Sequence, residues 1–143
     1  MSLSIGIIGY GYMGQIRRRI VEQHGDLDLV MICENIPEKL AEEKNFTVVS
    51  DPKEVIESDV QAVFICTPNN MIPDLTVKCL NRGKHVFCEK PPGRNLEDIS
   101  CMIDAEKANP GTKLMYGFNH RYHPGVLRAK SIVDSGRLGQ VVA

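Results

Sequence analysis

Short apolar runs alternate along the chain with longer segments in which apolar residues recur every three or four positions. The runs that are apolar at nearly every position predict strands over 3–9, 27–34, 46–50, 60–67, 84–90 and 112–118. The helical spacing predicts helices over 12–24, 36–45, 51–58, 70–83, 95–109 and 124–136. A last run, "QVVA" at 140–143, is expected to open one more strand.

This alternation predicts an α/β fold of the Rossmann type, with a doubly wound, mostly parallel sheet and helices on both of its faces. The whole chain, 1–143, is expected to form one dinucleotide-binding domain. In such a sheet ligands bind beyond the carboxyl ends of the strands, where the strand order reverses. Apolar stripes are predicted for two of the helices, one at Met13, Ile16, Ile20 and Val21 and one at Leu96, Ile99, Met102 and Ile103.

Three glycines follow the first predicted strand and open the first predicted helix, in the sequence G-Y-G-Y-M-G from Gly9 to Gly14. In a dinucleotide-binding turn the first glycine permits the tight bend and the second lets a pyrophosphate approach the backbone. The third lets the helix pack closely on the strand. Backbone amides at the helix start, from Tyr12 and Met13 onward, are expected to hold the phosphates with the helix dipole behind them.

The same turn requires an acidic residue about 20 positions further on, and Glu34 lies there, at the end of the second predicted strand. Its carboxylate is expected to accept hydrogen bonds from the adenosine ribose and to repel a 2′-phosphate. The sequence therefore favours NAD as the cofactor over NADP. Lys39 lies close enough in sequence to reach such a phosphate, so NADP stays open.

A lysine, Lys90, ends the predicted strand 84–90 in the sequence C-E-K-P-P-G. Its position directs it toward the ligand crevice, and a cis Lys90–Pro91 bond would set its direction. Beside the positive ring of an oxidised nicotinamide, a neutral amine is favoured that can take a proton from a substrate alcohol. Glu89 is expected to tune this charge or to hold a ribose hydroxyl.

The composition gives no sign of other partners. Seventeen basic and eighteen acidic residues leave a net charge of −1, which offers no attraction for nucleic acid or an anionic membrane surface. The basic triplet Arg17–Arg19 is interpreted as the solvated side of a helix. Five cysteines without a C-x-x-C pair indicate neither a disulfide framework nor a metal site and favour a reducing cytoplasm. No apolar stretch approaches the roughly 18 residues of a membrane span, and no signal peptide is expected.

These motifs, in this order, resemble the Gfo/Idh/MocA oxidoreductase family, the relatives of glucose-fructose oxidoreductase and inositol dehydrogenase. The resemblance rests on the glycine turn with Glu34, on "CTPNN" (66–70), on "GKHVFCEKPPG" (83–93) and on "YGFNHRYHPGVLRAKSIVDSGRLGQVV" (116–142). It covers the whole chain, and the E-K-P triplet is its most specific part. Family members carry a second, mainly antiparallel α/β domain, which this sequence is expected to lack, so the chain resembles the cofactor domain alone.

The resemblance also implies roles for single residues. Lys90 would sit at the nicotinamide and contact the reacting hydroxyl, while Thr67, Pro68 and Asn69 would line the cofactor. Arg121 and His123, in "NHRYHP", are candidates for substrate contact at the edge of the active site. The second domain usually supplies the histidine for proton transfer, which neither His120 nor His123 matches.

The function expected from all of this is hydride transfer between a nicotinamide and a hydroxyl-bearing carbon of a sugar, cyclitol or similar polyol. The chain alone is expected to bind NAD and to turn over poorly, since the substrate wall is missing; homo-oligomerisation is possible. The alternative from another class is a non-catalytic module that senses dinucleotides, which would not need Lys90. A branch that oxidises transiently and then eliminates, as some glycosidases do, also stays open.

Overall fold

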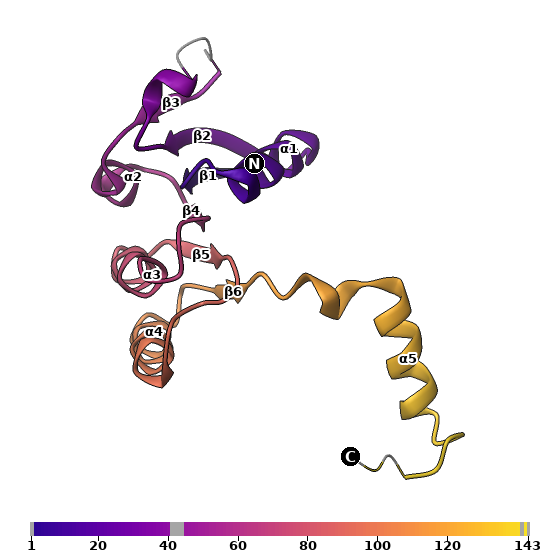
Figure 1. Ribbon diagram of the computed structural model, residues 1–143. Coiled ribbons are helices and arrows are strands. Elements are labelled where there is room, and N and C mark those ends of the chain that lie inside the picture. Colours follow the sequence, from indigo (N-terminus) through magenta and orange to yellow (C-terminus); the bar gives the residue numbers. More distant parts are fainter. Residues whose placement is uncertain (1, 41–44, 141, 143) are drawn as a thin grey trace.

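The computed structural model describes residues 2–40, 45–140 and 142. They form a six-stranded sheet in the order β3-β2-β1-β4-β5-β6, in which every neighbouring pair is parallel (Figure 1). The strands are β1 (Leu3–Ile8), β2 (Leu27–Cys33), β3 (Thr47–Val49), β4 (Ala62–Ile65), β5 (His85–Cys88) and β6 (Leu114–Tyr116). The predicted Rossmann-type architecture is confirmed, and each predicted strand from 3–9 to 112–118 is present.

The central strand explains why the apolar runs are continuous. β1 pairs with β2 on one side and with β4 on the other, so that Ile7 lies beside Ile32 and Phe64. Helices cover both faces of the sheet there, and the isoleucines Ile5, Ile7 and Ile8 are fully buried whichever way they point. Such a strand gains from an apolar residue at every position, which removes the alternation typical of half-exposed strands.

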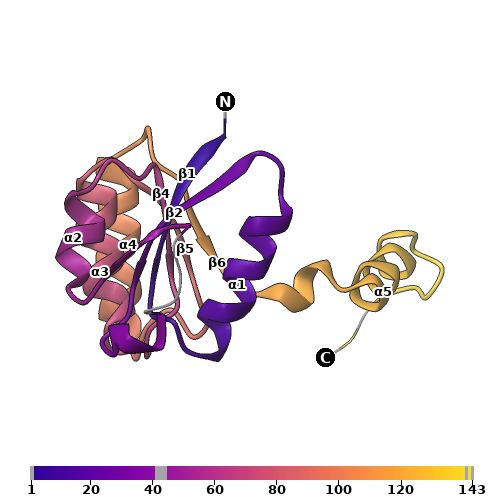
Figure 2. The same cartoon turned by 90° about the horizontal axis from the view of Figure 1, so that it is seen from above.

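The helices divide between the two faces of the sheet (Figure 2). α1 (Tyr12–Gln23) lies on one face, whereas α2 (Pro52–Glu57), α3 (Ile72–Asn81) and α4 (Leu96–Ala108) cover the other. The chain changes face between β3 and β4, because after β3 it returns past β2 and β1 to the other side of β1. The strand order therefore reverses between β1 and β4, and ligands of such sheets bind at this reversal.

Local interactions set several helix ends. The Asp51 carboxylate accepts the backbone N–H of Lys53 at 2.9 Å and caps α2. The Asn95 side chain accepts the N–H of Asp98 in the same way at the start of α4. Gly83, after α3, has φ +74°, a conformation that favours glycine at a helix end.

Three details differ from the sequence predictions. The segment predicted as a helix over 36–45 forms a short 3-10 helix, η1 (Pro37–Leu40), and residues 41–44 lie outside the described part. In α4 only Met102 of the predicted stripe is fully buried, whereas Leu96 and Ile103 are exposed. Of the predicted strand at 140–143, residues 141 and 143 lie outside the described part, and residues 140 and 142 are not in a strand.

The last helix leaves the sheet. After the 3-10 helix η2 (Asn119–Tyr122), α5 (Pro124–Asp134) extends away from the other elements (Figures 1 and 2). Its apolar residues Val126, Leu127 and Val133 are exposed. Among the described residues, no helix is both long enough and apolar enough to cross a membrane.

Candidate functional site

The glycine turn after β1 has the geometry that its spacing predicts. Gly9 has φ +92°, and a Cβ there would lie 2.8 Å from the carbonyl oxygen of Cys66. A Cβ on Gly14 would run into the carbonyl oxygen of Gly9. A Cβ on Gly11 would meet no atom within 4 Å. Gly9 and Gly14 are therefore required by the packing of the turn itself. Gly11 is not, and the space beside it is open to a ligand.

The start of α1 follows this open position. The first turn of a helix has backbone N–H groups without acceptors inside the helix, and the helix dipole adds partial positive charge there. No side chain caps α1 at Gly11, and the Gln15 N–H donates to the Gly11 carbonyl at 3.1 Å to begin the helix. The amides of Tyr12 and Met13 belong to this first turn. The arrangement suits a phosphate or another anion.

A hollow of about 500 Å³ lies at the carboxyl ends of β1, β2 and β4, at the reversal of strand order. We call it the β1–β4 hollow. Its lining residues are Ile8, Gly9, Tyr10, Gly11, Cys33, Glu34, Asn35, Ser50, Pro52, Cys66, Thr67, Pro68 and Met71. The structure thus brings together five of the residues predicted to bind the cofactor, namely Gly9, Gly11, Glu34, Thr67 and Pro68. Tyr12, Met13, Gly14 and Asn69 are not among its lining residues.

Glu34 is held at the rim of this hollow by the backbone. Its Oε2 accepts the N–H of Tyr10 at 3.1 Å and its Oε1 accepts the N–H of Ile36 at 3.2 Å. The residue is buried, so the direction of the carboxylate is set by the turn and by the end of β2. A carboxylate can accept several hydrogen bonds at once, which suits contact with a ligand hydroxyl.

Thr67 offers a hydroxyl to the same hollow. Its Oγ1 is buried and has no hydrogen-bond partner among the described residues. Leaving such a group unsatisfied costs on the order of 1–3 kcal/mol. A bound molecule with a polar group at this point would supply the missing partner, which fits the predicted role of Thr67.

Lys90 lies beyond β5, the strand next to β4, at the same edge of the sheet. Its side chain is exposed, and the Lys90–Pro91 bond is cis. A second hollow of about 690 Å³, which we call the Lys90 hollow, is lined by Lys90, Gly117, Phe118, Asn119, His120 and Arg121. None of these lining residues is acidic, and four of them carry hydrogen-bond donors in their side chains.

The structure places the two candidates for substrate contact, Arg121 and His123, in different surroundings. Arg121 lines the Lys90 hollow. His123 does not: its Nδ1 accepts the N–H of Gly125 at 3.2 Å and caps α5. Histidine is seldom the capping residue of a helix, so the sequence carried little sign of this use.

The cysteines near the site are weak nucleophiles. Burial raises the pKa of Cys33 to about 11 and that of Cys66 to about 12. The thiols are therefore protonated at neutral pH and behave as small apolar side chains, as predicted. All five cysteines are free. No group of three or more His, Cys, Asp and Glu residues in the described part of the chain is placed to hold a metal ion.

Comparison with known proteins agrees with this geometry. A family model described as an oxidoreductase family with an NAD-binding Rossmann fold, Gfo/Idh/MocA, matches residues 3–118. The chain belongs to this family.

Several dehydrogenases of the Gfo/Idh/MocA family are similar to the chain. An inositol 2-dehydrogenase of Salmonella typhimurium is 33% identical over 149 residues, which cover 98% of this chain and 44% of that protein. A myo-inositol 2-dehydrogenase of Thermotoga maritima is 34% identical over 146 residues, covering 96% and 42%. The solved structure of a scyllo-inositol dehydrogenase from Lactobacillus casei with bound NAD(H) and scyllo-inositol has a TM-score of 0.91 at 29% identity, covering 98% and 43%. The chain spans less than half the length of these relatives.

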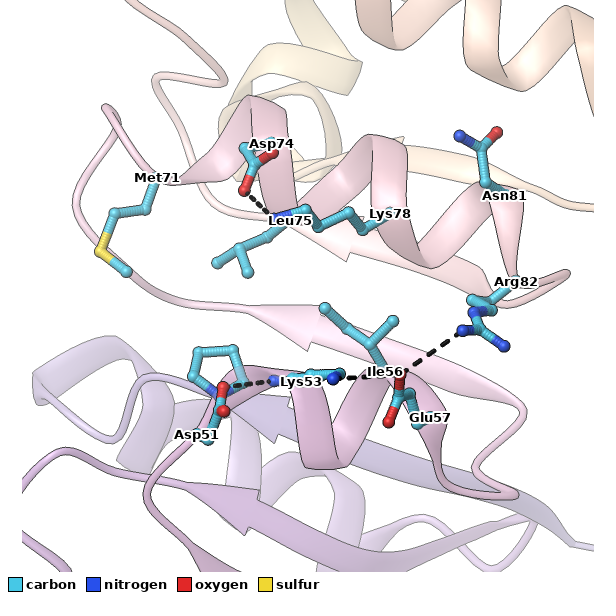
Figure 3. Close-up of a pocket in the computed structure, with 11 residues that line it drawn as sticks. Asp51, Lys53, Ile56, Glu57, Met71, Asp74, Leu75, Lys78, Asn81 and Arg82 are labelled. Atoms are coloured by element: carbon cyan, nitrogen blue, oxygen red, sulfur yellow. Dashed lines mark hydrogen bonds and ion pairs between the residues drawn. The ribbon is translucent and has the colours of Figure 1, made fainter.

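A third hollow in this Gfo/Idh/MocA domain, of about 660 Å³, lies between α2 and α3 (Figure 3). Ile56 and Leu75 give it an apolar floor, and ion pairs such as Lys78–Asp74 at 2.7 Å and Arg82–Glu57 at 3.5 Å surround it. These exposed pairs contribute little to stability. Pro52 and Met71 line both this hollow and the β1–β4 hollow, so the two are neighbours.

The interpretation of Arg17–Arg19 as a solvated face is wrong for its first member. Arg17 is only 8% exposed, and its guanidinium lies 4.6 Å from the ring centroid of Phe87 and pairs with Glu89 at 2.5 Å. Gly14, Arg17 and Val21 are the buried residues of α1, so they share the face that packs on the sheet. Ile20, which was predicted to belong to the apolar stripe of this helix, is exposed instead.

Glu89 consequently does not line either hollow described around the glycine turn and Lys90. Its carboxylate is buried against Arg17, whose Nε donates to Oε1 at 2.7 Å. The sequence held no direct sign of this pair, because the two residues lie 72 positions apart. In the sequence, the burial of Arg17 was indicated only by its position on the same helix face as Gly14.

Proposed function

We propose that this chain forms the dinucleotide-binding domain of an NAD(P)-dependent dehydrogenase that acts on a cyclitol, sugar or related polyol. The observation that carries the proposal is the position of Lys90 at the same sheet edge as the open glycine turn, one strand beyond the reversal. The inositol dehydrogenases among its relatives, one of them with NAD(H) and scyllo-inositol bound, support the polyol class.

The residues of the β1–β4 hollow fit a dinucleotide. The pyrophosphate would lie against Gly11 and the amides of Tyr12 and Met13, where no Cβ intervenes. Glu34 would accept the ribose hydroxyls, and the unpartnered Thr67 hydroxyl would gain a polar contact. Apolar edges for the adenine are available at Pro52 and Met71.

Glu34 favours NAD over NADP in this proposal. A carboxylate held in a fixed direction at the ribose position repels a 2′-phosphate, and burial leaves it little room to turn away. The predicted competitor for that phosphate, Lys39, has its side chain outside the described part of the chain.

When bound there, the nicotinamide ring supplies the site for hydride transfer. The protein residues then have separate tasks. Lys90 would hold the reacting hydroxyl and take its proton, a contribution of the order of 10²–10⁴-fold in rate for positioned acid–base groups. Asn119, His120 and Arg121 offer donors to the other hydroxyls of a polyol in the Lys90 hollow. Asn69, Glu89 and His123, which were also predicted to serve the site, have no proposed contact with the ligands.

Since the relatives are more than twice as long, we expect the chain by itself to bind dinucleotide but to turn over polyols poorly. Its five free cysteines, several of them buried, suit a reducing cytoplasm, where we expect the protein to act.

Titration calorimetry with NAD and NADP tests the proposal. NAD should release heat with a one-to-one stoichiometry, NADP should bind more weakly, and a crystal soaked with NAD should contain the pyrophosphate over Gly11. Absence of binding at millimolar dinucleotide, or density for the ligand elsewhere on the protein, would contradict it. Replacement of Lys90 by Ala should leave the affinity for NAD nearly unchanged, since the lysine serves the substrate.

A further inference from the structure

Arg17 connects three separate parts of the chain. Its Nε and Nη2 both lie on Glu89 Oε1, at 2.7 and 2.5 Å, and Nη2 also donates to Asn119 Oδ1 at 3.3 Å. The flat guanidinium rests over the ring of Phe87. One side chain on α1 thus contacts the end of β5 and the start of η2.

Both of the polar groups that Arg17 holds are neighbours of Lys90. Glu89 directly precedes the lysine. Its backbone N–H donates to the carbonyl oxygen of Ile65, the last residue of β4, at 3.0 Å. Asn119 lines the Lys90 hollow, as does Gly117, whose added Cβ would lie 2.9 Å from Glu89 Oε2. The Glu89 carboxylate is therefore enclosed between Arg17 and two walls of that hollow.

Stability alone does not explain this pair. Arg17 is 8% exposed and Glu89 is 5% exposed, so both charges lose most of their hydration on folding. Replacing a buried ion pair by apolar residues of similar size is often neutral or stabilising, whereas removing one member leaves an uncompensated charge. The pair instead fixes orientation, because the rigid, planar guanidinium of Arg17 orients the polar groups to which it donates.

We propose that Arg17 is a positioning residue for Lys90. Its guanidinium holds the strand end before the lysine and the loop beside it to α1, the helix that begins at the glycine turn. The distance between the phosphate-binding turn and the lysine is then set by one buried side chain. This inference rests on the cofactor and lysine roles proposed above.

The test uses three variants of the whole chain. Arg17→Met leaves the Glu89 charge buried and is expected to be unstable, so the informative variant is the double replacement Arg17→Met with Glu89→Leu. The matched control is Arg19→Met, in the same triplet but exposed. For each variant we would measure unfolding in urea, the affinity for NAD by calorimetry, and the acetylation rate of Lys90 with and without NAD by peptide mass spectrometry. Lys113, exposed before β6, serves as the internal reference.

In the parent protein and in the Arg19→Met control, NAD should change the acetylation rate of Lys90 relative to Lys113, because the bound nicotinamide lies beside the amine. The double variant should unfold at the same or a higher urea concentration and bind NAD as the parent does, yet lose this NAD-dependent change at Lys90. A retained change in the double variant would overturn the positioning role while leaving the cofactor site intact. Failure of the parent to bind NAD would overturn the proposed function and this inference together, and binding without any change at Lys90 would remove the basis of the inference alone.

Discussion

The carboxylate of Glu34 accepts the backbone N–H of Tyr10 at 3.1 Å, so the acid that ends β2 is tied to the glycine turn that follows β1. The second oxygen accepts the N–H of Ile36. Both bonds come from the backbone of the protein itself, and the carboxylate therefore has its direction before any ligand arrives. Such preorganisation lowers the entropy lost on binding.

Replacing Glu34 by Gln should weaken binding of NAD about tenfold and narrow the preference for NAD over NADP, because a hydrogen bond to a charged group contributes about 1.5–3 kcal/mol. Calorimetric titration with both dinucleotides measures the two effects. Glu38→Gln, a change at an exposed acid in η1, is the control and should bind as the parent does. Equal affinity of the Glu34→Gln and parent proteins for NAD would show that the acid does not contact the ribose.

Replacing Gly11 by Ala should leave the protein as stable as before and should abolish most of the dinucleotide affinity. The backbone at Gly11 has φ −71°, which alanine adopts readily, and its Cβ would meet no protein atom within 4 Å. The added methyl group would occupy the space of the phosphates. Thermal unfolding and NAD titration of the same preparation measure both properties, and unchanged affinity would mean that the pyrophosphate lies elsewhere.

Replacing Gly9 by Ala should chiefly lower stability. Backbone strain alone should reduce the free energy of unfolding by about 1–3 kcal/mol. The residue has φ +92°, and its Cβ would lie 2.8 Å from the Cys66 carbonyl oxygen. Urea unfolding without ligand measures the loss. A variant as stable as the parent would indicate that the turn relaxes easily, contrary to the packing described here.

Alkaline pH should destabilise the protein through its buried thiols. Burial raises the pKa from 9.0 to about 12 in Cys66, Cys79 and Cys88. Folded thiols keep their protons where unfolded ones release them, so this stabilising contribution is complete below pH 9 and is lost as the pH rises toward 12.

Each such thiol should reduce the free energy of unfolding by about 1.4 kcal/mol per pH unit within that range. Urea unfolding between pH 8 and pH 10.5 measures the slope. Cys79→Ala should lower stability at pH 8 by leaving a cavity and should flatten the alkaline decline, whereas Cys101→Ala, at an exposed position, is the control. A decline of equal steepness in Cys79→Ala and parent would refute the assignment.

Removing α5 should have little effect on the rest of the domain. Its apolar side chains are exposed, and within the described residues the helix contacts chiefly the adjacent η2. A chain ending at Tyr122 should keep the parent's urea midpoint and affinity for NAD. If the midpoint falls markedly, α5 contacts the sheet in solution in a way that the present structure does not contain.

The sequence predicted the parts of the fold that depend on local chemistry. Continuous apolar runs identified the buried parallel strands, and the glycine spacing with Glu34 identified the turn, because each of these patterns has one dominant physical cause. The caps at Asp51 and Asn95 are equally local, since their hydrogen bonds span two or three residues. Lys90 and Thr67 could be placed because both follow strands that meet at the same sheet edge.

The wrong predictions for Arg17 and for the apolar stripe of α4 concern contacts between distant residues. Three adjacent arginines in a helix look alike in sequence, and only the partner Glu89 across the sheet shows why Arg17 is inside. The spacing of Leu96 and Ile103 is helical, yet sequence periodicity does not reveal how wide a face the neighbouring helices cover. The side chain of His123 suits substrate contact, but the residue directly precedes a helix. In the structure this side chain accepts the N–H of Gly125 and caps that helix.

The order of the strands also bears on how the chain is made. β1 is synthesised first but lies between β2 and β4, and the Cys66 N–H closes its carboxyl end by donating to the Ile8 carbonyl at 2.8 Å. A nascent chain on the ribosome therefore cannot complete its nucleotide-binding loop until the segment through residue 66 has emerged. Long-range pairing of this kind slows folding relative to helical bundles. A ligand that binds at this loop would therefore meet only late intermediates, in which β4 has already paired with β1.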